Sequence, residues 1–125
     1  MLYNVRARPR TTELQRFWTL LTDGTIGSQE PDGLEIIASM KRAVLNWDMV
    51  HWSETCFCNP PLKHERTTVY DQFFSDIEVQ PKTGPEKLRG EQFWRYLQET
   101  FGETPTTDGA GYLTTGLRHV PLRIL

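Results

Sequence analysis

The sequence is poor in the features that would crosslink a protein or anchor it in a membrane. Only two of its 125 residues are cysteines, which excludes a framework of several disulfides. No apolar run reaches the roughly 18 residues that a membrane-spanning helix requires. The first ten residues also contain no apolar stretch typical of a secretory signal. We therefore expect a soluble cytoplasmic protein with reduced thiols and no membrane partner.

Neither sign of charge dominates, because 14 Lys and Arg residues stand against 16 Asp and Glu residues. This balance offers no electrostatic reason to bind nucleic acid, so we expect no nucleic-acid partner. The phosphate-binding loop, the nucleophile elbow, the zinc-protease motif and the dinucleotide-binding motif are all missing from the sequence. We accordingly expect no cofactor, and whether the protein is an enzyme stays open.

The apolar content is sufficient for one folded domain. Leu, Ile, Val and Phe together make up 30 of the 125 residues, which is above the level typical of disordered chains. We predict a single α+β domain over residues 1–102. Residues 103–116 contain four Gly or Pro and five Thr, so 103–125 are interpreted as a linker with an apolar C-terminal tail. That tail is either flexible or docked as an edge strand.

Strands and helices alternate along the predicted domain, which is typical of an α+β fold. We expect a small mixed sheet covered by helices on one face, in a ferredoxin-like or related sandwich. The uncovered face suggests a homodimer. Segments 34–45 and 62–75 fit either a helix or a strand. The composition of the first segment and the two prolines directly before the second favour helices. The predicted strands are 1–8, 49–58 and a short one around 77–79, and the predicted helices are 12–22, 34–45, 62–75 and 85–101.

The segment 51–71 concentrates the reactive side chains. Both cysteines and two of the three histidines fall between positions 51 and 64. If 49–58 is a strand, alternate side chains share one face, so Glu54 would lie beside both thiols. We predict a pocket here for a small polar or anionic ligand, with or without catalysis. The predicted catalytic residues are Glu54, Cys56, Cys58 and His64, and the predicted ligand-binding residues are Trp52, Arg66, Tyr70 and Asp71.

Two kinds of cysteine chemistry are possible for this segment. Cys56, Cys58 and His64 could supply three zinc ligands with Glu54 as a base. The Cys-x-Cys spacing is less usual than Cys-x-x-Cys, however, so no metal is predicted. A neighbouring histidine or arginine could instead activate a thiol as a nucleophile. Alternatively, Cys56 and Cys58 could take part in redox exchange by forming a strained disulfide with each other.

A purely structural role is the alternative to all of these. Cysteine is often a small buried hydrophobe, so the thiols and Trp52 could simply belong to the core. Glu54 would then need a partner, for which Arg66 or Lys63 is the candidate. In this interpretation the protein is a non-catalytic structural or protein-interaction domain that acts as a homodimer.

Overall fold

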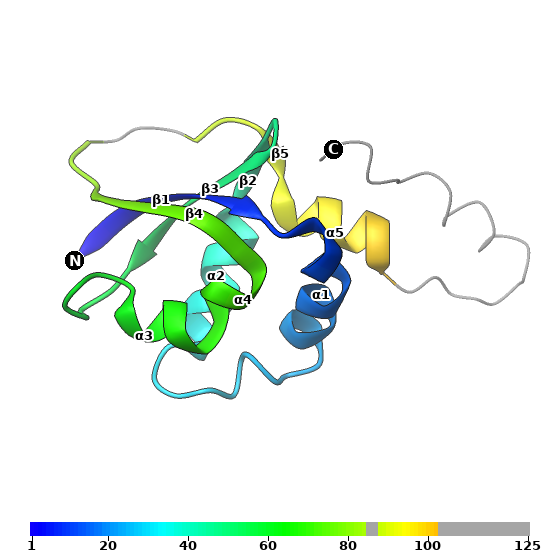
Figure 1. Cartoon of the computed structure of the whole chain (residues 1–125), viewed down its shortest axis with the longest axis horizontal. Coiled ribbons are helices and arrows are strands. Elements are labelled where there is room, and N and C mark those ends of the chain that lie inside the picture. The colour runs from blue at the N-terminus through cyan, green and yellow to red at the C-terminus, as the bar shows by residue number, and fades with distance from the viewer. Residues whose placement is uncertain (85–87, 103–125) are drawn as a thin grey trace, which may run out of the picture.

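The protein is a small α+β domain built on a five-stranded sheet (Figure 1). The computed structural model describes residues 1–84 and 88–102. The strand order is β4-β1-β3-β2-β5, and every neighbouring pair is antiparallel. The α+β class is thus confirmed, whereas the expected mixed sheet is wrong. Each helical connection joins two parallel strands that are separated in the sheet by a strand running the opposite way, so all neighbours are antiparallel. The specific ferredoxin-like arrangement is not confirmed.

The secondary structure is dominated by two long central strands and three helices of nine or ten residues. The strands are β1 (Leu2–Pro9), β2 (Val44–Asn46), β3 (Met49–Thr55), β4 (Phe74–Pro81) and β5 (Glu91–Gln92). The helices are α1 (Leu14–Thr22), α2 (Gly33–Arg42), α3 (Lys63–Glu65), α4 (Asp71–Phe73) and α5 (Phe93–Phe101), with a 3₁₀ turn at Thr11–Glu13 and a π-helical turn, η2, at Arg66–Tyr70.

Strand β1 lies between β4 and β3 in the sheet and has one buried face, as its alternating sequence predicts. Tyr3, Val5 and Ala7 are buried on one face, while the intervening side chains face outward. Val5 lies opposite Trp52 of β3 and Val79 of β4. Helices α1, α2 and α4 lie on the same side of this sheet (Figure 1). The covered face therefore holds the core, and the other face carries ion pairs such as Arg6 with Glu78.

The segment 34–45 is a helix for most of its length, as predicted, but the helix ends three residues earlier than expected. Helix α2 ends at Arg42, and Ala43 has an extended backbone that starts the short strand β2. Leu45 of β2 is buried opposite Val50. The sequence missed this strand because three residues are too few to show a period of two.

The segment 62–75 is also helical, although it is divided into α3, the π turn η2 and α4. Phe74 is already extended and begins β4, so the predicted short strand around 77–79 has eight residues. A π turn inserts an extra residue and so changes the face that the following side chains present. Val69 and Tyr70 within the turn point inward, and so does Glu65, which directly precedes it.

The last helix begins much later than predicted. Residues 88–92 are not helical, and α5 starts only at Phe93. Gly90 has a φ of +143°, and a Cβ there would lie 2.4 Å from the Leu45 carbonyl oxygen, so the chain passes close to β2 before β5. The predicted start at Pro85 and the predicted linker and tail at 103–125 lie outside the described residues. No helix in the described ranges has the length and apolarity to span a membrane.

Candidate functional site

The site begins where β3 leaves the sheet. Trp52 and Glu54 point inward from the strand and are fully buried. The amide of Thr55 then donates to Oε2 of Glu35 on α2 at 2.9 Å, and the amide of Cys56 donates to the Met1 carbonyl at 2.9 Å. Both cysteines therefore lie in the loop that follows the strand, and not on the strand where the sequence had placed them.

This loop wraps its backbone around the sulfur of Cys56. The amide of Cys58 donates to Cys56 Sγ at 3.2 Å, and the amide of Leu62 donates to the same atom at 3.3 Å. Leu62 has a φ of +65°, a left-handed conformation that a branched side chain seldom adopts. Such strain is typical of functional sites, and here it accompanies the turn that presents the second amide to the sulfur.

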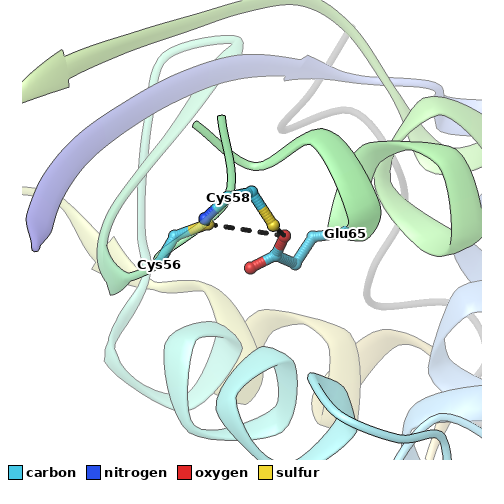
Figure 2. Close-up of side chains that lie close together, drawn as sticks. All are labelled: Cys56, Cys58 and Glu65. Carbon is cyan, nitrogen blue, oxygen red and sulfur yellow. Dashed lines mark hydrogen bonds between the residues drawn. The ribbon is translucent and has the colours of Figure 1, made fainter. Parts of the chain in front are cut away.

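Glu65 completes the cluster from the other side of the loop. Its Oε1 lies 3.7 Å from Cys56 Sγ and 3.6 Å from Cys58 Sγ, and both thiols are free (Figure 2). The three potential ligand atoms all lie within 4.8 Å of one another. Cys56 and Glu65 are 3% and 1% exposed, whereas Cys58 is half-buried. The cluster is thus enclosed on the core side and reachable through Cys58.

Burial raises the pKa of the Cys56 thiol to about 11. The two backbone amides oppose this shift because they stabilise the thiolate, whereas the charge of Glu65 adds to it. At neutral pH the Cys56 thiol is therefore protonated and acts as a weak hydrogen-bond donor toward Glu65.

Glu54 lies deeper in the core and forms a separate cluster. Its Oε1 accepts hydrogen bonds from Trp52 Nε1 at 2.9 Å and from the Tyr70 hydroxyl at 2.6 Å. Its Oε2 is buried and has no hydrogen-bond partner among the described residues. Burial raises the pKa of Glu54 to about 8, and the nearby charge of Glu65 contributes to the rise. The partner expected from the sequence, Arg66 or Lys63, is replaced by two neutral donors.

An open cavity of about 460 Å³ lies above the thiols. Its charged lining residues, Asp32 and Glu35, are both acids, and Phe57 on its rim is 88% exposed. Glu35 is held in place by Arg42, which donates from its guanidinium at 3.2 Å. The cavity is lined by Pro31, Asp32, Glu35, Thr55, Cys56, Phe57 and Cys58.

The remaining predicted residues are directed elsewhere. His64 is hydrogen-bonded through Nδ1 to Asp32, and with Cys58 it lines a second hollow on the other side of the loop. Arg66 donates to Asp71 at 2.8 Å on the surface. The structure therefore brings Cys56 and Cys58 together with Glu65. Trp52 and Tyr70 donate hydrogen bonds to Glu54 in a second cluster. The other three predicted residues, His64, Arg66 and Asp71, lie outside both clusters.

Sequence reasoning missed three acids that define the site. Glu65, Asp32 and Glu35 are not among the site residues that the sequence predicts. The Pro-Asp-Gly turn at 31–33 marks Asp32 as a turn residue and gives no sign of its partner. No local pattern could have identified Glu35 or Glu65, because each reaches the cysteines only through the tertiary fold.

Comparison with known proteins adds no further evidence on the site. No protein-family model matches the chain, and no curated protein or solved structure matches it.

Proposed function

We propose that this protein is a ligand-binding domain that takes a compact cationic ligand in the cavity above Cys56 and Cys58. The observation that carries this proposal is the convergence of acids on the two thiols. Asp32 and Glu35 line the cavity, and Glu65 lies directly beneath it in contact with both sulfur atoms. No cationic side chain lines the cavity among the described residues.

The charge of these groups argues against the anionic ligand that the sequence suggested. Arg66, the residue expected to recognise an anion, is engaged with Asp71 on the surface. Arg42 does not line the cavity, and it is already bonded to Glu35 and to the Ser53 carbonyl. An anion entering the cavity would meet two carboxylates, whereas a cation would be attracted by them.

Binding is also better supported than thiol catalysis. A nucleophilic cysteine needs a lowered pKa and access to its substrate. Cys56 is buried with a raised pKa, so it meets neither requirement. Glu54 is enclosed by Trp52 and Tyr70, so a substrate in the cavity would not reach it.

A thermal-shift screen of the reduced full-length protein tests this proposal. The panel contains thiophilic divalent ions, organic cations such as polyamines, and anions such as phosphate and citrate. We expect stabilisation by one or more cations and by none of the anions, and we expect Glu35→Gln to weaken it. Glu78→Gln, which removes a charge from the opposite face of the sheet, serves as the matched control. Stabilisation by anions alone would contradict the proposal.

A second candidate is the protein-interaction domain, which one observation favours. Phe57 is 88% exposed between the two cysteines, and an exposed aromatic side chain is typical of contact surfaces. In this proposal Phe57 inserts into a partner, which the sequence suggests is a second copy of the chain. Sedimentation of wild-type and Phe57→Ala protein over a range of concentrations tests this. A concentration-independent monomer mass for the wild type would exclude the homodimer.

Two further expectations stay as proposals. A ferredoxin-like fold is supported by the order of β1 to β4 in the sheet, with a helical crossover after β1 and another after β3. The additional strand β5 and helix α5 would then be an extension of that arrangement. A cytosolic location is supported by the two free thiols, since reduced cysteines are usual in that compartment.

A further inference from the structure

We infer that Cys56, Cys58 and Glu65 form a binding site for a thiophilic divalent metal ion of the zinc class. This inference rests on the proposed function, because it names the cation that the acidic cavity would take. It also departs from the expectation of no metal, which rests on the Cys-x-Cys spacing; the zinc site considered there has His64 as its third ligand. In the structure the third ligand is the carboxylate of Glu65.

The two sulfur–oxygen distances in the cluster match a zinc coordination sphere. Zinc binds thiolates at about 2.3 Å and carboxylate oxygens at about 2.1 Å, so at tetrahedral angles S and O ligands are about 3.6 Å apart. Oε1 of Glu65 lies 3.7 Å from Cys56 Sγ and 3.6 Å from Cys58 Sγ. The two sulfur atoms lie within 4.8 Å of each other, and binding an ion requires them to be about 3.8 Å apart at the tetrahedral angle.

The backbone around Cys56 provides a second, independent observation. Two amides, those of Cys58 and Leu62, point at its sulfur. Amide donors stabilise the thiolate over the thiol, and partners of this kind orient and tune metal ligands. The more usual Cys-x-x-Cys spacing lets backbone amides point at the sulfur atoms. Here the left-handed turn at Leu62 supplies that geometry from farther along the chain.

The surrounding acids would also be compensated by a dication. Glu65 is 1% exposed, and its hydrogen-bond contacts among the described residues are the two thiols, which are weak donors. Buried carboxylates are costly unless a positive charge or strong donors balance them. Lys63 and Arg66, the cations nearest in sequence to Glu65, are directed to solvent or to Asp71.

The donor set determines the class of ion. Two sulfur ligands select zinc and similarly thiophilic ions, whereas magnesium and calcium require oxygen ligands. Binding forms two metal–sulfur bonds and one metal–oxygen bond, and the two thiol protons leave to solvent. Three protein ligands leave a fourth position for water or a further ligand, on the side where Cys58 meets the cavity.

Cobalt titration of the reduced, chelator-treated full-length protein tests the inference, because the absorption spectrum of bound Co²⁺ depends on its ligands and their geometry. We expect thiolate-to-cobalt charge-transfer absorption together with the intense visible bands of tetrahedral cobalt. One equivalent of Zn²⁺ should abolish both, and Mg²⁺ should abolish neither. The absence of charge-transfer absorption at a stoichiometric excess of Co²⁺ would overturn the inference.

Variants identify the ligands. We expect Cys58→Ser and Glu65→Gln to weaken cobalt affinity at least about tenfold, as loss of a ligand should cost no less than loss of a supporting group. Both substitutions preserve side-chain volume, so they test the site even if the buried Cys56→Ser variant fails to fold. Glu78→Gln and His64→Ala should bind as the wild type does. Weakened binding in His64→Ala with normal binding in Glu65→Gln would overturn the proposed ligand set.

The outcomes also separate this inference from the proposed function. If an organic cation stabilises the protein and Glu35→Gln weakens the effect, but cobalt yields no thiolate absorption, the cavity binds cations and the metal site is wrong. If neither metal ions nor organic cations stabilise the protein, both proposals fail.

Discussion

The hydroxyl of Tyr70 donates a 2.6 Å hydrogen bond to Oε1 of Glu54 in the interior of the protein. The same oxygen accepts from Trp52 on β3, so a single carboxyl joins the sheet to the π turn that ends at Tyr70. Glu65 lies directly before that turn and faces the two cysteines. The buried carboxyl of Glu54 therefore fixes the segment that presents Glu65 to the thiols.

The stability of the metal-free protein should depend on pH through Glu54. Burial raises its pKa from 4.5 to about 8 in the folded state, and the charges of Glu65 and Glu35 add to this rise. A raised folded-state pKa means that its stabilising contribution is complete below about pH 4.5 and is lost as pH rises through 8. We expect the free energy of unfolding to fall by up to about 5 kcal/mol across that window, from about 1.4 kcal/mol per pKa unit.

Urea unfolding in the presence of a chelator, at intervals between pH 4.5 and 9, measures this dependence. Glu54→Gln retains the acceptor for Tyr70 and Trp52 but cannot ionise, so its stability should be nearly flat over the same range. Glu78→Gln is the matched exposed control and should follow the wild type. An unchanged pH profile in Glu54→Gln would show that Glu54 is not the titrating group.

Removing the Tyr70 hydroxyl should destabilise the protein. In Tyr70→Phe the ring still packs against Trp52, whose centroid is 5.1 Å away, but Glu54 loses its shortest hydrogen bond. We expect a loss of about 1–3 kcal/mol, the usual cost of leaving a buried polar group without its partner. The double variant with Glu54→Ala should show a non-additive loss, because each single substitution already removes this hydrogen bond. Strict additivity would mean that the hydroxyl and the carboxyl are not coupled.

The two thiols should react at very different rates in the native, metal-free protein. A pKa of about 11 against an ordinary value of 9.0 reduces the thiolate fraction of Cys56 about a hundredfold at neutral pH. Cys56 is also 3% exposed, whereas Cys58 is half-buried. We expect Cys56→Ser to be labelled readily by a thiol reagent and Cys58→Ser to be labelled only slowly until denaturant is added. Equal labelling rates in the two variants would contradict the described loop.

Replacement of Gly33 by alanine should disturb the helix that supplies Glu35. A Cβ at Gly33 would lie 2.1 Å from the Ile26 carbonyl oxygen and 2.9 Å from that of Gly27, and backbone atoms cannot easily move away. We expect Gly33→Ala to lower the free energy of unfolding by about 1–3 kcal/mol, as overpacking typically does. Gly84→Ala, where nothing lies within 4 Å of the added Cβ, should change it little. Equal stability of the two variants, measured by urea unfolding, would contradict this close approach.

Periodicity in the sequence determined the main elements of the fold. The alternation of Tyr3, Val5 and Ala7 predicted a strand with one buried face, and apolar residues spaced three and four apart predicted α1. Such patterns can be interpreted locally because each side chain reports its own face. The three-residue strand β2 and the late start of α5 at Phe93 could not be found in this way. Both depend on pairing with residues far away in the sequence, as where Leu45 lies opposite Glu91.

The sequence also identified the segment in which the site lies, because Cys56 and Cys58 are the only cysteines in the chain. Only the tertiary structure decided which groups meet there. The loop at 56–62 leaves the strand and turns its amides onto Cys56, and the short helix α3 brings Glu65 to face both thiols. His64, one residue earlier, is directed to Asp32 instead. One position along a helix rotates a side chain by about 100°, so proximity in sequence could not distinguish the glutamate from the histidine.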